Sequence, residues 1–133
     1  MPTLIDTNIL VYASGVDQDP GRQWRAIQAL ESHRFEGALA VQVLAEFASV
    51  LIRKGRTAQT IRDDVTTFVK TWRIIAPDDE TVPLAMAAVI DYRMSFWDAM
   101  LWAIALQNGF TTILSADGPT GSTIGGVKYK SPF

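Results

Sequence analysis

The 133-residue chain contains no cysteine and a single histidine, His33. Without thiols it can form neither a disulfide framework nor a thiolate metal site, and this composition fits a reducing cytoplasm. No apolar run approaches the roughly 20 residues that a membrane-spanning helix needs. Asp6 also interrupts the N-terminus before a secretory signal could form. We therefore expect a cytoplasmic protein that does not associate with membranes.

An excess of charge of one sign is also missing, because the net charge is only -2. A polyanionic substrate would therefore have to be bound by local basic patches or by metal ions. The lone His33 has no second imidazole beside it, which argues against catalysis of the Ser/His/Asp kind. The densest basic cluster, Arg53-Lys54-Gly55-Arg56, can contact RNA phosphate or can simply complement the dipole of its own helix end.

Along the chain, segments typical of strands alternate with segments typical of helices. We expect strands at 3–5, 37–41, 72–76, 111–114 and 127–130, and helices at 7–13, 21–33, 43–54, 57–71, 82–94 and 95–108. In the second of these helices Trp24, Ile27 and Leu30 recur at helical spacing. The order predicts one α/β domain over residues 1–133, with a Rossmann-like three-layer architecture. Its central, mostly parallel sheet of four to five strands would be flanked by helices.

Four acidic residues fall where a strand ends or a helix begins: Asp6, Glu46, Asp98 and Asp117. Asp6 and Asp117 follow predicted strands, whereas Glu46 and Asp98 lie in the opening turns of predicted helices. Sites in open parallel sheets form at the carboxyl ends of the strands, so all four side chains can point to the same edge. This placement predicts a carboxylate cage for a divalent metal ion.

Each acid also has a purely structural interpretation. Asp6 can cap the helix that starts beside it, Ser95-Phe96-Trp97-Asp98 has the pattern of a capping box, and Asp117-Gly118 is a common turn dipeptide. Glu46 lies beside the apolar stripe of its helix, where a carboxylate without a partner is costly. The shared edge of the predicted sheet is what favours a joint role.

A ligand set made only of carboxylates favours Mg²⁺ or Mn²⁺ and disfavours zinc. Such ions offset the negative charge of a phosphodiester and lower the pKa of a bound water. Two ions roughly 4 Å apart can activate the water and stabilise the leaving oxygen. The acids therefore predict metal-dependent hydrolysis of phosphodiester bonds.

The sequence resembles PIN-domain nucleases along its whole length. Leu4-Ile5-Asp6-Thr7-Asn8-Ile9-Leu10 is similar to the opening of that family, and Ala45-Glu46-Phe47 falls at its helical glutamate. Ser95-Phe96-Trp97-Asp98-Ala99 and Leu114-Ser115-Ala116-Asp117 match its third and fourth acidic blocks. The closing segment, from Gly125-Gly126-Val127 to Pro132-Phe133, is similar to the tails of VapC-like toxins.

Two features depart from the family pattern. Ala116 stands where many relatives carry a further acid, and the Gly-, Ser- and Thr-rich segment 118–126 leaves the geometry after Asp117 open.

The resemblance implies a PIN-like fold and a Mg²⁺- or Mn²⁺-dependent endoribonuclease that acts as the growth-inhibiting toxin of a type II toxin-antitoxin pair. It implies Asp6, Asp98 and Asp117 as principal metal ligands, with Glu46 holding a second ion or an ordered water. Thr7, Asn8 and Ser115 would orient these carboxylates. It further implies a homodimer, and an antitoxin partner that blocks the acidic pocket and alone binds DNA. One or two partly exposed tryptophans could line a groove for that partner; the four are Trp24, Trp72, Trp97 and Trp102.

Two alternatives remain open. A catalytically silent PIN-like binding domain would keep the fold, and mutating its acids would leave its effect intact. A receiver-like phospho-acceptor module would use Asp78 or Asp79, after the strand at 72–76, together with Lys128. That module expects paired acids after the first strand, where Asp6 has no acidic neighbour.

Overall fold

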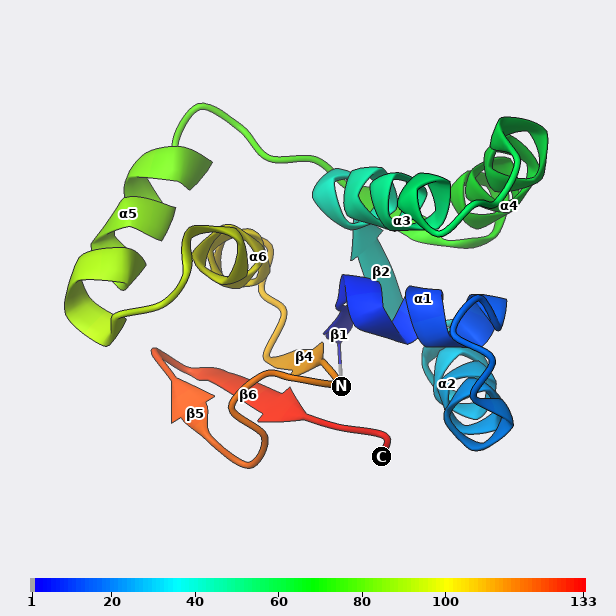
Figure 1. Ribbon diagram of the computed structural model, residues 1–133. Helices are drawn as coiled ribbons and strands as arrows, with labels where there is room; N and C mark the ends of the chain where they lie inside the picture. Colours follow the sequence, from blue (N-terminus) through cyan, green and yellow to red (C-terminus); the bar gives the residue numbers. More distant parts are fainter. Residues whose placement is uncertain (1) are drawn as a thin grey trace.

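The computed structural model describes residues 2–133, which form six strands and six helices, and single strands alternate with pairs of helices along most of the chain (Figure 1). The strands are β1 (Thr3–Ile5), β2 (Gly37–Ala40), β3 (Arg73–Ile75), β4 (Thr112–Leu114), β5 (Thr123–Ile124) and β6 (Val127–Lys130). The helices are α1 (Thr7–Ser14), α2 (Pro20–His33), α3 (Val41–Arg53), α4 (Ala58–Thr71), α5 (Thr81–Tyr92) and α6 (Phe96–Gln107). This arrangement confirms the predicted α/β fold, with helices flanking a central sheet.

The strands form one sheet in the order β3-β2-β1-β4-β6-β5, and all neighbours pair in parallel except β5 with β6. From β1 the chain builds outward through β2 and β3, and it later crosses to the other side of β1 to form β4. The strand order therefore reverses at β1 and β4. Crevices for ligands form outside the carboxyl ends of parallel strands at such a reversal.

The core lies along the middle strands and the helices that cover them. Leu4, Leu39 and Ile113, from β1, β2 and β4, have no exposed surface. Helix α6 is buried along seven consecutive residues, from Ala99 to Ala105, because the sheet lies on one side of it and α5 on another. Among residues 2–133 every helix is too short or too polar to cross a lipid bilayer.

Helix α2 buries small side chains and exposes larger ones. Trp24 is 63% exposed and Ile27 is 37% exposed, whereas the buried positions are Ala26 and Ala29. The small alanines allow α2 to approach α1 closely, and the larger side chains that share its helical spacing are left at the surface. Of the three residues Trp24, Ile27 and Leu30, only Leu30 is half-buried and packs against the core.

The segment 118–126, whose geometry the sequence left open, contains the two-residue strand β5, which forms a hairpin with β6. This edge strand raises the number of strands to six, one more than the upper prediction. At the start of β2, Gly37 is required sterically, because a Cβ there would lie 2.5 Å from the carbonyl oxygen of His33.

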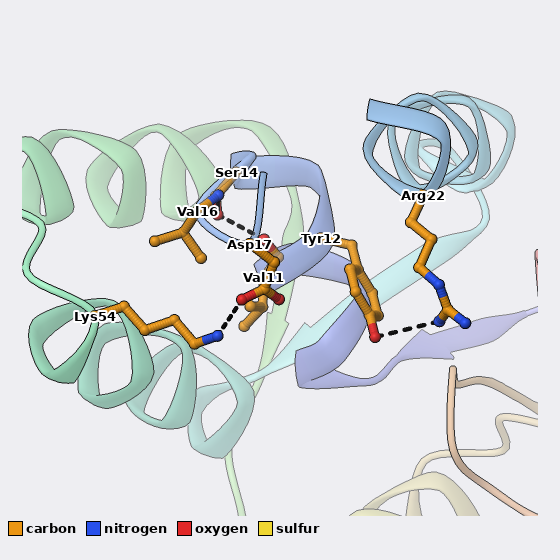
Figure 2. A network of polar contacts seen from close by, with 7 residues as sticks. All are labelled: Val11, Tyr12, Ser14, Val16, Asp17, Arg22 and Lys54. Atoms are coloured by element: carbon orange, nitrogen blue, oxygen red, sulfur yellow. Dashed lines mark hydrogen bonds and ion pairs between the residues drawn. The ribbon is translucent and has the colours of Figure 1, made fainter. Parts of the chain in front are cut away.

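Polar contacts fasten the connection between α1 and α2 (Figure 2). The ammonium group of Lys54, at the end of α3, pairs with Asp17, and Arg22 donates a hydrogen bond of 3.2 Å to the Tyr12 hydroxyl. Arg56 donates a hydrogen bond of 3.0 Å to the carbonyl oxygen of Ser14. Two cations of the basic cluster at the end of α3 therefore hold the end of α1 and the turn that follows it.

Candidate active site

All four predicted acids line one cavity of about 210 Å³ outside the carboxyl ends of β1 and β4. Its complete lining is Asp6, Thr7, Asn8, Glu46, Asp98, Ser115, Asp117 and Gly118. The structure thus brings together all seven side chains indicated by the sequence, although the role of each remains a prediction. The lining contains no lysine or arginine, so no positively charged side chain of the described residues lines the cavity together with these carboxylates.

Asp6 is held by hydrogen bonds on both of its carboxylate oxygens. Oδ1 accepts a bond of 2.7 Å from the backbone N–H of Thr7, and Oδ2 accepts one of 2.8 Å from the Ser115 hydroxyl. The backbone N–H of Asp6 donates to the carbonyl oxygen of Leu114 at 2.9 Å. Asp6 therefore caps α1 and also faces the cavity, so its structural and functional interpretations are compatible.

The electrostatics of the cavity act most strongly on Asp6. Burial raises the pKa of its carboxyl group from 3.8 to about 6, against the lowering effect of the bonds from Ser115 and Thr7. The negative charges of Asp98 and Glu46 raise this pKa further. Desolvation and like charge both disfavour the carboxylate form, and a bound cation would relieve the repulsion between these groups.

Asp117 is positioned by Asn8. The side-chain amide nitrogen of Asn8 lies 2.5 Å from each carboxylate oxygen of Asp117 and donates to both. Asn8 lies in the first turn of α1, two residues after the capping Asp6, so one helix start carries both Asp6 and the partner of Asp117. The neighbouring Ala116 brings no additional carboxylate.

Glu46 has a partner that sequence reasoning missed. The amide nitrogen of Gln42, one helical turn earlier on α3, donates a hydrogen bond of 2.8 Å to Oε1 of Glu46. The same nitrogen donates at 3.2 Å to the carbonyl oxygen of Trp97, the residue before Asp98. Gln42 therefore links the two helices that carry Glu46 and Asp98. The spacing of four residues between Gln42 and Glu46 was the available signal.

Asp98 lies in the first turn of α6, and its side chain is exposed to solvent at the cavity. The capping-box interpretation of Ser95 and Asp98 is wrong, because the Ser95 side chain makes no capping hydrogen bond. Within residues 2–133, the Asp98 carboxylate accepts no hydrogen bond from the protein. It is therefore free to bind a ligand.

The receiver-like alternative is not supported by the sheet. Asp78 follows β3 at one side of the sheet, whereas Lys128 lies in β6, with β2, β1 and β4 between them. The Asp78 carboxylate instead accepts hydrogen bonds from Glu80 and Gln107. An acceptor aspartate and a strand-end lysine do not meet in this fold.

The oxygen-rich cavity fits a hard divalent cation by the chemistry of its donors. No group of three or more acidic, histidine or cysteine side chains in the described part of the chain is already arranged to hold an ion. The fit therefore rests on the four carboxylates that line one cavity, where burial and, to a smaller extent, the charges of Asp98 and Glu46 raise the pKa of Asp6.

A second cavity, of about 270 Å³, opens beside the first and shares Asp6, Asp98 and Gly118 with it. Tyr129 of β6 lines this cavity with only 4% of its surface exposed. Burial, together with the negative charges of Asp98 and Asp6, raises the pKa of the Tyr129 hydroxyl well above its usual range. That hydroxyl is therefore neutral at physiological pH and lies within the field of the acidic site.

Known structures with the same fold include a toxin and a chain of a toxin-antitoxin complex. A chain of a toxin-antitoxin complex from Klebsiella pneumoniae is similar with a TM-score of 0.74 and 22% identity, over 98% of each chain. VapC20 from Mycobacterium tuberculosis, described as a toxin that cleaves the sarcin-ricin loop, gives a TM-score of 0.74 and 18% identity over 88% of this chain and 91% of its own. VapBC2 from Rickettsia felis, bound to promoter DNA, gives a TM-score of 0.73 and 17% identity over 98% of each chain.

At such low identity these likenesses establish the fold alone. The curated proteins include no match to this sequence. The family itself is shown by a direct match of residues 3–118 to the PIN domain. The chain therefore belongs to the PIN domain family.

Proposed function

We propose that this protein is an endoribonuclease that depends on Mg²⁺ or Mn²⁺ and acts as the toxin of a toxin-antitoxin pair. One observation carries the proposal: four carboxylates line a single cavity of a PIN domain, and no lysine or arginine lines it with them. Such a cavity attracts a divalent cation, and a cation held by carboxylates suits phosphodiester hydrolysis. The description of the similar VapC20 as an RNA-cleaving toxin supports RNA as the substrate.

In this proposal Asp6, Asp98 and Asp117 would hold the metal, and Glu46 would hold a second ion or an ordered water. When bound, the ion supplies a water of lowered pKa and positive charge beside the phosphodiester. The protein's own contribution is orientation. Thr7 and Ser115 fix the two oxygens of Asp6, and Asn8 fixes the Asp117 carboxylate.

The same proposal includes a cognate antitoxin and a homodimer. Similar folds occur in toxin-antitoxin complexes, one of them bound to DNA, which supports DNA binding through the antitoxin. Helix α5 exposes Val82, Met86 and Ile90 at intervals of four residues, an apolar stripe that suits a subunit interface. Ile52 of α3 and Val69 of α4 are also exposed and would suit a partner peptide.

Growth and RNA integrity after induced expression test this function together. We expect wild-type protein to arrest growth and to produce RNA fragments with discrete ends, whereas Asp98→Asn does neither. Asp63→Asn, which changes an exposed acid of α4, is the matched control and should behave as wild type. Equal arrest by wild type and Asp98→Asn, without RNA fragments, would instead establish the catalytically silent binding domain.

A further inference from the structure

The second cavity differs in character from the carboxylate cavity that it adjoins. Apolar and aromatic side chains form most of its wall, including Tyr92, Met94, Ile113, Ile124 and Tyr129. At about 270 Å³ it lies just below the range of roughly 300–1,000 Å³ typical of small-ligand sites. It suits one flat heterocycle better than a folded segment of a partner protein.

The Tyr129 hydroxyl is an unpaired polar group in this largely apolar wall. Its oxygen is buried and has no hydrogen-bond partner among residues 2–133. Buried polar groups in folded proteins are almost always hydrogen-bonded, and leaving one unsatisfied costs roughly 1–3 kcal/mol. A ligand with a polar edge and an apolar face would satisfy this hydroxyl while it fills the cavity.

The rim combines one positive charge with the acids of the metal site. Arg93 follows α5 in a left-handed backbone conformation, with φ of 56°, and its side chain is exposed. It makes no ion pair within the part of the chain that the structure describes. Asp6 and Asp98 line the same cavity. A phosphate that a metal ion holds near these acids could therefore also contact Arg93.

The wall formed by the β5–β6 turn is fixed before any ligand binds. The indole N–H of Trp102 donates a hydrogen bond of 2.9 Å to the carbonyl oxygen of Ile124, and the Tyr92 and Trp102 rings meet edge to face at 5.7 Å. A Cβ at Gly125 would lie 2.7 Å from the Trp102 ring, so only glycine allows this close approach. The cavity is therefore largely preformed.

We propose that this cavity binds the base of the RNA nucleotide adjacent to the cleaved phosphodiester. The Tyr129 hydroxyl would hydrogen-bond to the edge of the base, the apolar wall would contact its face, and Arg93 would contact a flanking phosphate. Tyr129 and Arg93 would then determine which nucleotide is placed at the carboxylate site. This inference rests on the proposed ribonuclease function and adds a source of sequence preference to it.

Mapping of cleavage sites in an RNA pool of random sequence tests the preference. Wild-type protein should favour one base at a position flanking the cut, and Tyr129→Phe should reduce that preference roughly tenfold, as expected when a site loses one hydrogen bond. Met94→Trp should abolish it by filling the cavity. Tyr12→Phe removes a hydroxyl outside this cavity and should retain the preference. Preference that is absent from wild type, or unchanged in both cavity variants, would overturn the inference.

Methyl NMR in Ca²⁺ tests binding without requiring cleavage. Titration with the four nucleoside 5′-monophosphates should shift the methyl signals of Ile113 and Ile124, with one base binding best, and leave that of Ile61 on α4 unmoved. Such shifts in a protein that cuts no RNA would contradict the ribonuclease proposal but support the base site. RNA cleavage without methyl shifts from any nucleotide would contradict the base site alone, and is the result expected if a partner protein fills the cavity.

Discussion

The hydroxyl of Ser115 donates a hydrogen bond of 2.8 Å to Oδ2 of Asp6, across 109 positions of sequence. The two residues meet because β1 and β4 pair in parallel with Ile5 opposite Leu114, so the next residue of each strand emerges at the same edge. The bond also lowers the pKa of Asp6, which burial otherwise raises to about 6. Ser115 therefore influences both the position and the charge of the most constrained carboxylate in the site.

Ser115→Ala should move the acid limb of the activity-pH profile to higher pH. This bond lowers the pKa of Asp6 and so opposes the effect of burial. Without it the pKa of Asp6 rises further, and the carboxylate form is lost at a higher pH. We expect a loss of roughly tenfold in cleavage rate near pH 6, with a smaller loss near pH 8. Ser32→Ala removes a hydroxyl on α2 that bonds to Gln28, and serves as control. An unchanged acid limb in Ser115→Ala would refute this role.

The contribution of Asp6 to the stability of the metal-free protein should fall as pH rises from about 4 to about 6. The folded-state pKa of Asp6 lies above the ordinary value of 3.8, so the folded protein holds this proton more tightly than the unfolded chain does. The stabilisation is complete below the unfolded value and disappears as pH passes the folded value. A shift from 3.8 to about 6 corresponds to about 3 kcal/mol.

Asp6→Asn isolates this contribution, because asparagine does not titrate. Urea unfolding in EDTA should show that the free energy of unfolding of Asp6→Asn rises relative to that of wild type between pH 4 and pH 6. Above pH 6 the difference between the two proteins should stay constant. Added Mn²⁺ should stabilise wild type at pH 7 more than it stabilises the variant. A difference between the two proteins that does not change with pH would show that Asp6 is not shifted.

Gln42→Ala should lower the cleavage rate at saturating Mg²⁺ by roughly tenfold, because Glu46 would lose its link to the start of α6. Gln42→Glu keeps the shape of the side chain but removes the N–H donor, so it should be at least as damaging. Gln59→Ala, at an exposed site of α4, is the control. Full activity of both Gln42 variants would mean that this bridge does not position Glu46.

Asn8→Ala should raise the Mg²⁺ concentration required for half-maximal cleavage. Loss of a group that orients a metal ligand typically costs about 10–100-fold in metal affinity. Here the Asp117 carboxylate would lose the amide that contacts both of its oxygens. Asn108→Ala removes a comparable amide from the end of α6 and should leave the metal requirement as in wild type. The same requirement in Asn8→Ala and wild type would contradict this role for Asn8.

The convergence of the four acids could be predicted from the sequence because it follows from local rules. Parallel strands place their carboxyl ends at one edge, so an acid after β1 and another after β4 must lie near each other. The strand and helix boundaries needed for that argument were evident from short apolar runs and glycine stops. Asp6 and Asp117 illustrate this, because Asp6 follows β1, Asp117 follows β4, and these two strands are neighbours in the sheet.

Contacts between distant segments could not be predicted in the same way. The Gln42 amide reaches the Trp97 carbonyl across 55 positions, and no periodicity in either helix signals that contact. Tyr129 looked like an ordinary strand residue, and only the packing of β6 beside β4 brings it to the acidic site. In α2 the helical spacing of Trp24, Ile27 and Leu30 did not show which side chains are buried, since close packing on α1 favours small alanines over Trp24.

The most direct test of the central claim is the Mg²⁺-dependent cleavage rate of a defined RNA by wild type, Asp6→Asn, Asp98→Asn and the control Asp63→Asn. All four proteins should first be shown to be folded by circular dichroism. We predict that wild type and Asp63→Asn cut at equal rates that vanish in EDTA and return with Mg²⁺, while Asp6→Asn and Asp98→Asn fall at least about 100-fold. Cleavage by Asp6→Asn and Asp98→Asn at the wild-type rate would contradict the account.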